Sequence, residues 1–404
     1  MNATPNIAEP NSSRIASIDL IRGAVMILMA IDHVRVFSGV PAGGPSAGVF
    51  FTRWITHFCA PAFIFLAGTS SFLYGRRHDS LSRFLVSRGL WLVFLELTIL
   101  RLSWTFNLDF AHYEMAGVLW VIGWCMVLMA GLVKLPYKVV GIVGLLIVGG
   151  HNLLDATLRS IIFSQNNSAV PAVWKIAYVG FFAGPISAGP NGPNLIVLYS
   201  IIPWIGVMAA GYAFGSLLVF EKLRRDRLCY ALGTGAVVLF ILLRGFNLYG
   251  DPFPWRAAQA ASNGRPGMSG FFSFLNATKY PASLSFLLMT LGPTIALIPL
   301  LEGAQGAVAK VITVFGRVPF FYYVLHIPLI HFLALVTSFI LHGEVNSWLF
   351  LNHPMGNPPP PEGYTWSLWT LYAVWGVAVA ILYVPCRRFA ELKAKRKDWW
   401  LSYV

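Results

Sequence analysis

The chain has 404 residues, of which 57% are hydrophobic and only 11% are charged. Soluble globular proteins average about 25% charged and under 50% apolar residues. This composition excludes a soluble enzyme, a disordered protein and a disulfide-stapled secreted domain, and it indicates a membrane protein with many helical spans. Lys and Arg outnumber Asp and Glu by 29 to 16, a formal charge of +13. We attribute the excess to basic cytoplasmic loops facing anionic lipid headgroups, and we expect no nucleic-acid partner.

Ten stretches are candidates for membrane helices, because about 20 mainly apolar residues cross a bilayer. They lie near residues 18–38, 54–75, 84–103, 116–133, 139–154, 195–219, 229–249, 283–301, 319–341 and 366–386. Residues 172–188 are also apolar but are broken by Gly and Pro, and we interpret them as a re-entrant or interfacial segment, with an eleventh helix as the alternative. The predicted fold class is all-α, a polytopic membrane helix bundle.

The distribution of Lys and Arg predicts how the bundle is oriented. With the N-terminus inside, most basic residues fall on that same side, in the turns at 76–83, 134–138, 220–227 and 302–318 and in the tail at 387–397. Positive residues favour cytoplasmic loops, so we expect both termini to be cytoplasmic. The expected organisation is a polar tail (1–17), one transmembrane domain (18–386) and a basic tail (387–404). The first apolar segment lacks a cleavage site, so we expect no cleaved signal peptide.

Ionisable residues inside a span cost at least ~2.5 kcal/mol on insertion scales and mark function by default. The first predicted helix, SIDLIRGAVMILMAIDHVR, is rich in them. Arg22 and His33 are eleven residues apart, about three turns, so they share one stripe some ~16 Å apart. Asp32 points elsewhere, and we expect it to pair with Arg35 or to orient His57. For Arg22, snorkelling to the inner interface is the alternative.

Further candidates lie near the predicted outer surface. Arg53 and His57 are spaced i, i+4 at the start of the second helix, and the first two helices form a hairpin that can bring His57 close to His33. Two histidines near one outer pocket suggest proton transfer. Arg101, near the outer end of the third helix, is a candidate to bind an anion.

Two outer loops combine polar and aromatic residues. RGFNLYGDPFPW (244–255) contains Asn247, Tyr249 and Asp251, and FLNATKYPASL (274–284) contains Lys279. Such residues suit a sugar or polyol, with an ordinary aromatic belt as the alternative.

The ninth helix contains two histidines, His326 and His331. They differ by five positions, about 140° around a helix, so we do not expect one metal to bind both. The sequence has no motif of a metal site or of a permanently bound cofactor.

Several motifs together carry a family resemblance. The first-helix motif, FIFLAGTSSFLYGRR (63–77), YSIIPWIGVMAAGY (199–212), NLYGDPFPW (247–255) and LNATKYPASL (275–284) resemble the bacterial relatives of heparan-α-glucosaminide N-acetyltransferase. The Arg22 to His33 spacing also resembles the broader transmembrane acyltransferase superfamily. The resemblance runs through most of the chain.

The resemblance implies a multi-pass enzyme of the bacterial cytoplasmic membrane that moves an acyl group, often acetyl, from cytoplasmic acyl-CoA to a small-molecule or glycan acceptor outside. In the lysosomal enzyme the catalytic His is held to lie in the first lumenal loop. The corresponding loop here, SGVPAGGPSAGVFFT (38–52), has no His, so we expect His33 or His57 to do that work, with loss of that reaction as the alternative.

The expected catalytic residues are therefore His33, His57 and Asp32. The residues expected to bind acyl-CoA or substrate are Arg22, Arg53, Arg101, Asn247, Tyr249, Asp251, Lys279, His326 and His331. A proton-coupled transporter of a small polar solute is the alternative function, because intramembrane Asp, His, Glu and Arg also form proton relays. A homodimer is compatible with the sequence, which picks out no surface for it.

Overall fold

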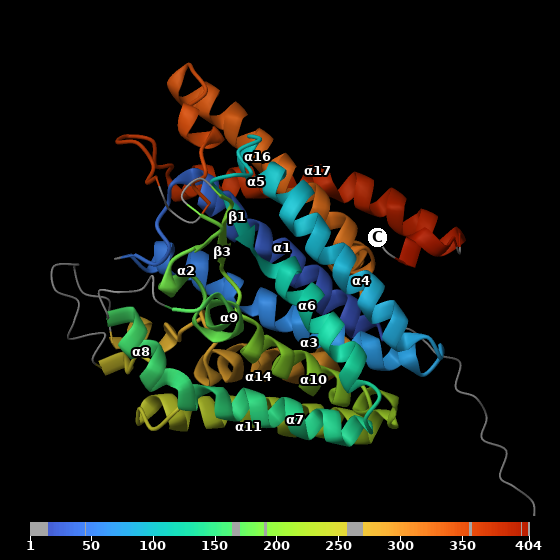
Figure 1. The fold of residues 1–404 in the computed structure, drawn as a ribbon. Helices are drawn as coiled ribbons and strands as arrows, with labels where there is room; N and C mark the ends of the chain where they lie inside the picture. Colours follow the sequence, from blue (N-terminus) through green and yellow to red (C-terminus); the bar gives the residue numbers. More distant parts are fainter. Residues whose placement is uncertain are drawn as a thin grey trace, which may run out of the picture.

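The computed structural model describes residues 15–44, 46–163, 170–189, 192–256, 270–354, 358–396 and 398–402 (Figure 1). Most of the predicted N-terminal tail, residues 1–14, lies outside the described residues, as do Lys397 and residues 403–404 of the C-terminal tail. The α-helices are α1 (Ala16–Ser38), α2 (Ala47–Trp54), α3 (Cys59–Gly75), α4 (Leu81–Leu95), α5 (Arg101–Thr105), α6 (Val118–Leu132), α7 (Tyr137–Gly150), α8 (Asp155–Phe163), α9 (Ala172–Trp174), α10 (Ile201–Phe214), α11 (Lys222–Gly245), α13 (Gly270–Leu275), α14 (Leu284–Leu301), α15 (Ala307–Arg317), α16 (Pro319–His342) and α17 (Leu368–Lys395).

The fold is a mostly helical, polytopic membrane architecture. Within the described ranges, seven helical segments are long and apolar enough to cross a bilayer: Ala47–Gly75, Tyr137–Ile162, Ile201–Val219, Lys222–Gly245, Leu284–Leu301, Pro319–His342 and Leu368–Lys395. All ten predicted stretches contain a helix. Three of them fall outside the seven because α1 and the continuous α4–α5 run carry several charges and α6 is short.

The structure differs from the predicted elements in two places and discriminates between the two interpretations of a third. The second stretch begins earlier, with α2 and a 3-10 turn, η1 (Ile55–Phe58), ahead of α3. Residues 195–197, expected to begin a helix, instead belong to strand β3 (Asn194–Val197), which pairs in parallel with β1 (Glu114–Ala116) and antiparallel with β2 (Ile186–Ser187). The apolar helical segment Ala172–Ala183 is shorter than the ~20 residues that a span needs, which fits the re-entrant or interfacial interpretation better than an eleventh span.

Helix α1 runs through the middle of the bundle and contacts α3, α14, α15, α16 and α17 (Figure 1). The pairs α4 with α6, α10 with α7 and α11 with α14 pack around it. Close approach of α1 to α15 depends on two glycines. A Cβ at Gly23 would lie 1.9 Å from the Ile312 carbonyl oxygen, and one at Gly316 would lie 1.7 Å from the Asp19 carbonyl oxygen. Small residues at such crossings let membrane helices gain van der Waals contact.

Candidate active site

The C-terminal half of α1 brings His33 into contact with His326 of α16. His33 Nδ1 lies 2.5 Å from His326 Nε2, and the two rings stack with centroids 4.7 Å apart. His326 Nδ1 lies 2.6 Å from the Tyr323 carbonyl oxygen. A carbonyl oxygen only accepts, so His326 Nδ1 carries the proton and, in the neutral ring, Nε2 accepts. His33 therefore donates from Nδ1 and keeps a lone pair on Nε2, the state that a general base or nucleophile requires.

Aromatic side chains hold this histidine pair in place. The Trp104 ring meets His33 edge-on at 4.9 Å, and the Tyr322 ring stacks on His326 at 5.3 Å. His326 is completely buried, whereas His33 is only partly buried. The pair thus consists of a fully buried ring, His326, that fixes the tautomer, and a partly exposed ring, His33.

Asp32 pairs with Arg35, one of its two expected partners. Arg35 Nε donates to Asp32 Oδ1 at 2.7 Å, and Arg35 Nη1 donates to the Val40 carbonyl oxygen at 3.0 Å. The pair therefore ties the end of α1 to the loop that follows it. Asp32 lies beside His33 in sequence but faces another direction, as helix geometry requires.

Two further cations, Arg53 of α2 and Lys279 of the loop before α14, act electrostatically on both Asp32 and His57. Lys279 is 7% exposed, and its Nζ lies 5.2 Å from the centre of the Tyr280 ring. Among the described residues, Lys279 makes no ion pair with a carboxylate. Buried charges are costly unless paired, so this cation has capacity for a negative partner.

His57 lies in η1, between α2 and α3, and is 2% exposed. Its ring meets Phe286 edge-on at 5.4 Å, and neither ring nitrogen has a hydrogen-bond partner within the described ranges. His57 therefore shares the charged surroundings of Asp32 but lacks the defined tautomer of His33.

Comparison with known proteins shows which family the chain belongs to. Residues 14–249, more than half of the chain, match the family model described as "Heparan-alpha-glucosaminide N-acetyltransferase, catalytic". The chain belongs to this family. No curated protein matches it. Its catalytic domain is that of an acetyltransferase family, and its apolar helices are those of a membrane protein. The chain is therefore a membrane acetyltransferase. The matched range includes His33 and His57 but ends before Lys279 and His326.

Other residues that the sequence predicted to bind acyl-CoA or substrate lie elsewhere in the bundle. Arg22, near the other end of α1, donates to Ser70 Oγ at 3.0 Å and lies 3.6 Å from Asp19. His331 is fully buried, with Nδ1 3.0 Å from the Ser103 carbonyl oxygen and Nε2 3.0 Å from the Leu349 carbonyl oxygen. His331 therefore joins α16 to two other segments, and it does not contact the His33 pair.

Arg101 makes its hydrogen bonds within the protein itself. Its guanidinium donates to the carbonyl oxygens of Asn107, Asp109 and Tyr113 and to the Asn107 side chain, and its Cζ lies 4.5 Å from the centre of the Phe110 ring. These contacts organise the loop after α5. We therefore leave Arg101 out of the proposed substrate site.

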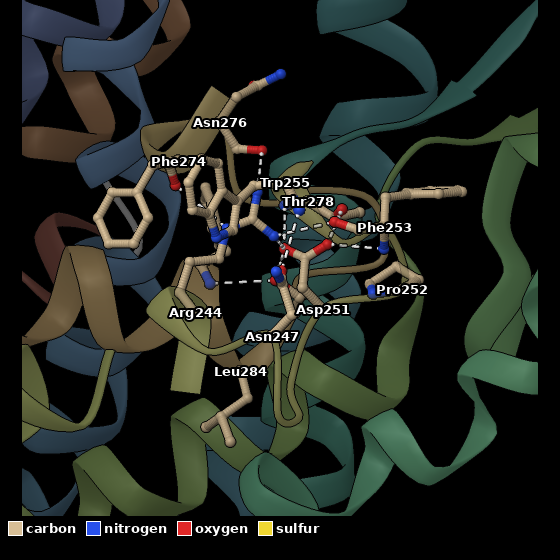
Figure 2. Close-up of polar contacts among 12 residues, drawn as sticks. Arg244, Asn247, Asp251, Pro252, Phe253, Trp255, Phe274, Asn276, Thr278 and Leu284 are labelled. Carbon is tan, nitrogen blue, oxygen red and sulfur yellow. Dashed lines mark hydrogen bonds and ion pairs between the residues drawn. The ribbon is translucent and has the colours of Figure 1, made fainter. Parts of the chain in front are cut away.

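The two polar loops, 244–255 and 274–284, are joined by an ion pair whose arginine we did not single out from the sequence as a site residue (Figure 2). Arg244 Nη1 lies 3.0 Å from Asp251 Oδ2, and the same guanidinium donates to four carbonyl oxygens, those of Phe253, Ser273, Phe274 and Asn276. Asp251 also accepts from the Thr278 backbone and hydroxyl, at 2.9 and 2.8 Å. The position of Arg244 inside a predicted span was the signal that could have identified it.

Asn247 and Tyr249 support the same loop. Asn247 has φ of +51°, a left-handed conformation that Asn tolerates better than most residues, and its Oδ1 accepts from the Trp255 backbone at 3.2 Å. The Tyr249 hydroxyl donates to the Gly149 carbonyl oxygen at 2.7 Å. All three predicted residues, Asn247, Tyr249 and Asp251, line one cavity of about 330 Å³. No cluster of three potential metal ligands occurs in the described part of the chain.

Proposed function

We propose that the protein transfers an acyl group, acetyl by family analogy, from cytoplasmic acyl-CoA to a hydroxyl or amine of a sugar-like acceptor on the outer side of a bacterial cytoplasmic membrane. The observation that carries this proposal is the His33–His326 contact, which leaves His33 Nε2 as an available base. Family membership supplies the reaction class, and the histidine geometry supplies the residue that performs it.

In the proposed reaction, His33 Nε2 removes the proton from the acceptor hydroxyl or amine as the acceptor attacks the thioester carbonyl carbon. The carbon–sulfur bond then breaks, and the proton passes from the His33 imidazolium to the departing CoA thiolate. His326 stays neutral and holds His33 in one tautomer. Lys279 and Arg53 supply positive charge for the oxyanion that forms on the carbonyl oxygen.

The opposite end of α1 suits the CoA part of the donor. We assign the phosphates to basic residues near the predicted inner surface: Arg22 in α1, Arg317 at the end of α15, Arg76 and Arg77 after α3, and Arg83 and Arg88 in α4. Guanidinium groups bind phosphate with charge-assisted, often bidentate hydrogen bonds. With both termini cytoplasmic, donor and acceptor approach α1 from opposite sides of the bilayer.

The proposal is tested with the purified full-length chain in detergent, by measuring acetyl-CoA cleavage with and without candidate acceptors. We expect His33→Ala to lower the rate by about 10² to 10⁴. The matched control is His112→Ala, because His112 is exposed in the loop between α5 and β1 and contacts only Asp109 among the described residues. Thermal unfolding of each variant verifies that it is folded.

Full activity of His33→Ala would remove His33 from the mechanism. Absence of acetyl-CoA binding by the wild type would overturn acyl transfer itself. Uptake of a polar solute by proteoliposomes without acyl-CoA would then favour the proton-coupled transporter.

A further inference from the structure

The 330 Å³ cavity beside the Arg244–Asp251 pair is lined by polar side chains that the proposed reaction does not use. It lies where α8, the end of α11 and the start of α14 meet, and it includes Asp155, Arg159 and Ser285. Its volume is at the lower end of the range for small-molecule sites.

The cavity contains one negative and one positive group that are not paired with each other. Asp155 is 8% exposed; its carboxylate accepts from Asn152 Nδ2 and from the Tyr178 hydroxyl, at 2.9 and 3.0 Å, and has no cation within ion-pair distance among the described residues. Arg159 is exposed and donates from Nη1 to the Pro252 carbonyl oxygen at 3.3 Å. The other two charges of the cavity, Arg244 and Asp251, neutralise each other.

Ser285 provides an independent sign of a ligand. Its side chain is completely buried, it lines the cavity, and its Oγ has no hydrogen-bond partner in the described part of the chain. A buried hydroxyl without a partner costs free energy that a ligand can recover.

The apolar residues at the cavity show which kind of molecule can enter. Leu153 and Leu248 line it and are 78% and 68% exposed. Leu153 belongs to the candidate span Tyr137–Ile162, and Leu248 follows directly after the span Lys222–Gly245. The cavity therefore lies at the boundary between lipid and water, where an amphiphile presents its headgroup to protein and its chains to the bilayer.

We propose that this cavity binds the zwitterionic headgroup of an aminophospholipid, with the ammonium group at Asp155 and the phosphate at Arg159. A buried carboxylate needs a cationic partner, and a primary ammonium offers it three donors. An exposed guanidinium suits a phosphate at the headgroup level. The hydroxyl of Ser285 is then available to a headgroup oxygen or to the ammonium.

The test uses the purified full-length chain, stripped of lipid by detergent exchange and then offered dioleoyl phosphatidylethanolamine, phosphatidylcholine or phosphatidylglycerol. Native mass spectrometry measures the lipid retained. We expect phosphatidylethanolamine to be retained about tenfold more than the other two, because only it has N–H donors for Asp155. Equal retention of phosphatidylethanolamine and phosphatidylcholine would overturn the proposal.

Two variants separate the two charges. Asp155→Asn should reduce phosphatidylethanolamine to the level of phosphatidylcholine, whereas Arg159→Gln should reduce both, because both carry the phosphate. The matched controls are Glu362→Gln and Arg387→Gln, two exposed sites away from the cavity, which should leave retention unchanged. An unchanged preference in Asp155→Asn would contradict the assignment.

A third variant keeps the proposal falsifiable if Asp155→Asn does not fold. Ser285→Val removes no side-chain hydrogen bond to any described residue and should lower retention of phosphatidylethanolamine about two- to fivefold; unchanged retention would count against the site. Protection against thermal unfolding by glucosamine, lost in the Asp155 or Ser285 variant and without any lipid preference, would show an amino-sugar site and overturn the lipid assignment. Because acetyl-CoA cleavage is measured separately, failure here leaves the proposed function standing.

Discussion

His33 and His326 are 293 positions apart in the chain, yet His33 Nδ1 lies 2.5 Å from His326 Nε2. The Tyr323 carbonyl oxygen determines which nitrogen of His326 holds its proton, and His326 in turn determines which nitrogen of His33 is free. A backbone carbonyl thus sets, through two rings, the protonation state of the group to which we assign the base.

Replacing His326 tests whether it fixes the tautomer of His33. His326→Ala should lower kcat about 10²-fold with little change in KM, because His33 remains present but is no longer held in one tautomer. His326→Gln should recover part of the rate, since its amide oxygen can accept from His33 Nδ1. Steady-state kinetics of acetyl transfer distinguish the two variants, and equal rates for them would contradict a positioning role through hydrogen bonding.

The contact between α1 and α15 should be intolerant of one added methyl group. In Gly316→Ala the new Cβ would lie 1.7 Å from the Asp19 carbonyl oxygen, so the two helices must separate, at a cost of about 1–3 kcal/mol. The control is Gly131→Ala in α6, where no atom of the described residues would lie within 4 Å of the added Cβ. Thermal unfolding in detergent should show a lower Tm for Gly316→Ala alone. If both variants melted at the same temperature, the close packing would be incorrect.

Breaking the Arg244–Asp251 pair should destabilise the two polar loops that it joins. Asp251→Ala leaves a guanidinium that is 2% exposed without its carboxylate, and losing one partner of a buried pair costs about 3–5 kcal/mol. The exposed pair of Arg387 and Glu391 provides the comparison, because solvent screens it, and Arg387→Gln should leave Tm unchanged. A normal Tm for Asp251→Ala would show that the pair does not hold these loops together.

His353, in the loop after η8 (Ser347–Phe350), should make the free energy of unfolding depend on pH below neutrality. His353 is 1% exposed and stacks on Trp348 at 3.9 Å, and burial, with a smaller effect of His331, lowers the pKa of His353 from 6.5 to about 4. The unfolded chain therefore binds a proton more readily between these values, so the free energy of unfolding is highest above pH 6.5. It falls, by about 3 kcal/mol at most, as pH drops toward 4.

His353→Phe keeps the stacking on Trp348 and removes the titrating group. Its unfolding free energy should therefore vary less between pH 7 and pH 4 than that of the wild type, as measured by denaturant titration at each pH. His342→Gln, at an exposed position on α16, serves as the control and should retain the wild-type dependence. An identical slope in His353→Phe would mean that other groups produce the acid sensitivity.

Composition and local pattern were enough to predict the membrane class, a helix in each of ten stretches, and Arg35 as one of two partners for Asp32. These follow from hydropathy over about 20 residues and from i, i+3 spacing, both of which are local properties of a chain. The same local rules failed at residues 195–197, because strand β3 depends on a partner, β1, that lies about 80 positions earlier.

Only the tertiary structure decided which of the predicted polar residues meet. His33, His57, Asp32, Arg53 and Lys279 share one electrostatic neighbourhood, whereas Arg101 and His331 are occupied by backbone carbonyls. The helical period shows which residues share a face, but not which helix covers that face. The covering helix is decided by how α1 packs against α15 and α16. That packing depends on the sum of contacts between residues far apart in the chain, which no short window of sequence contains.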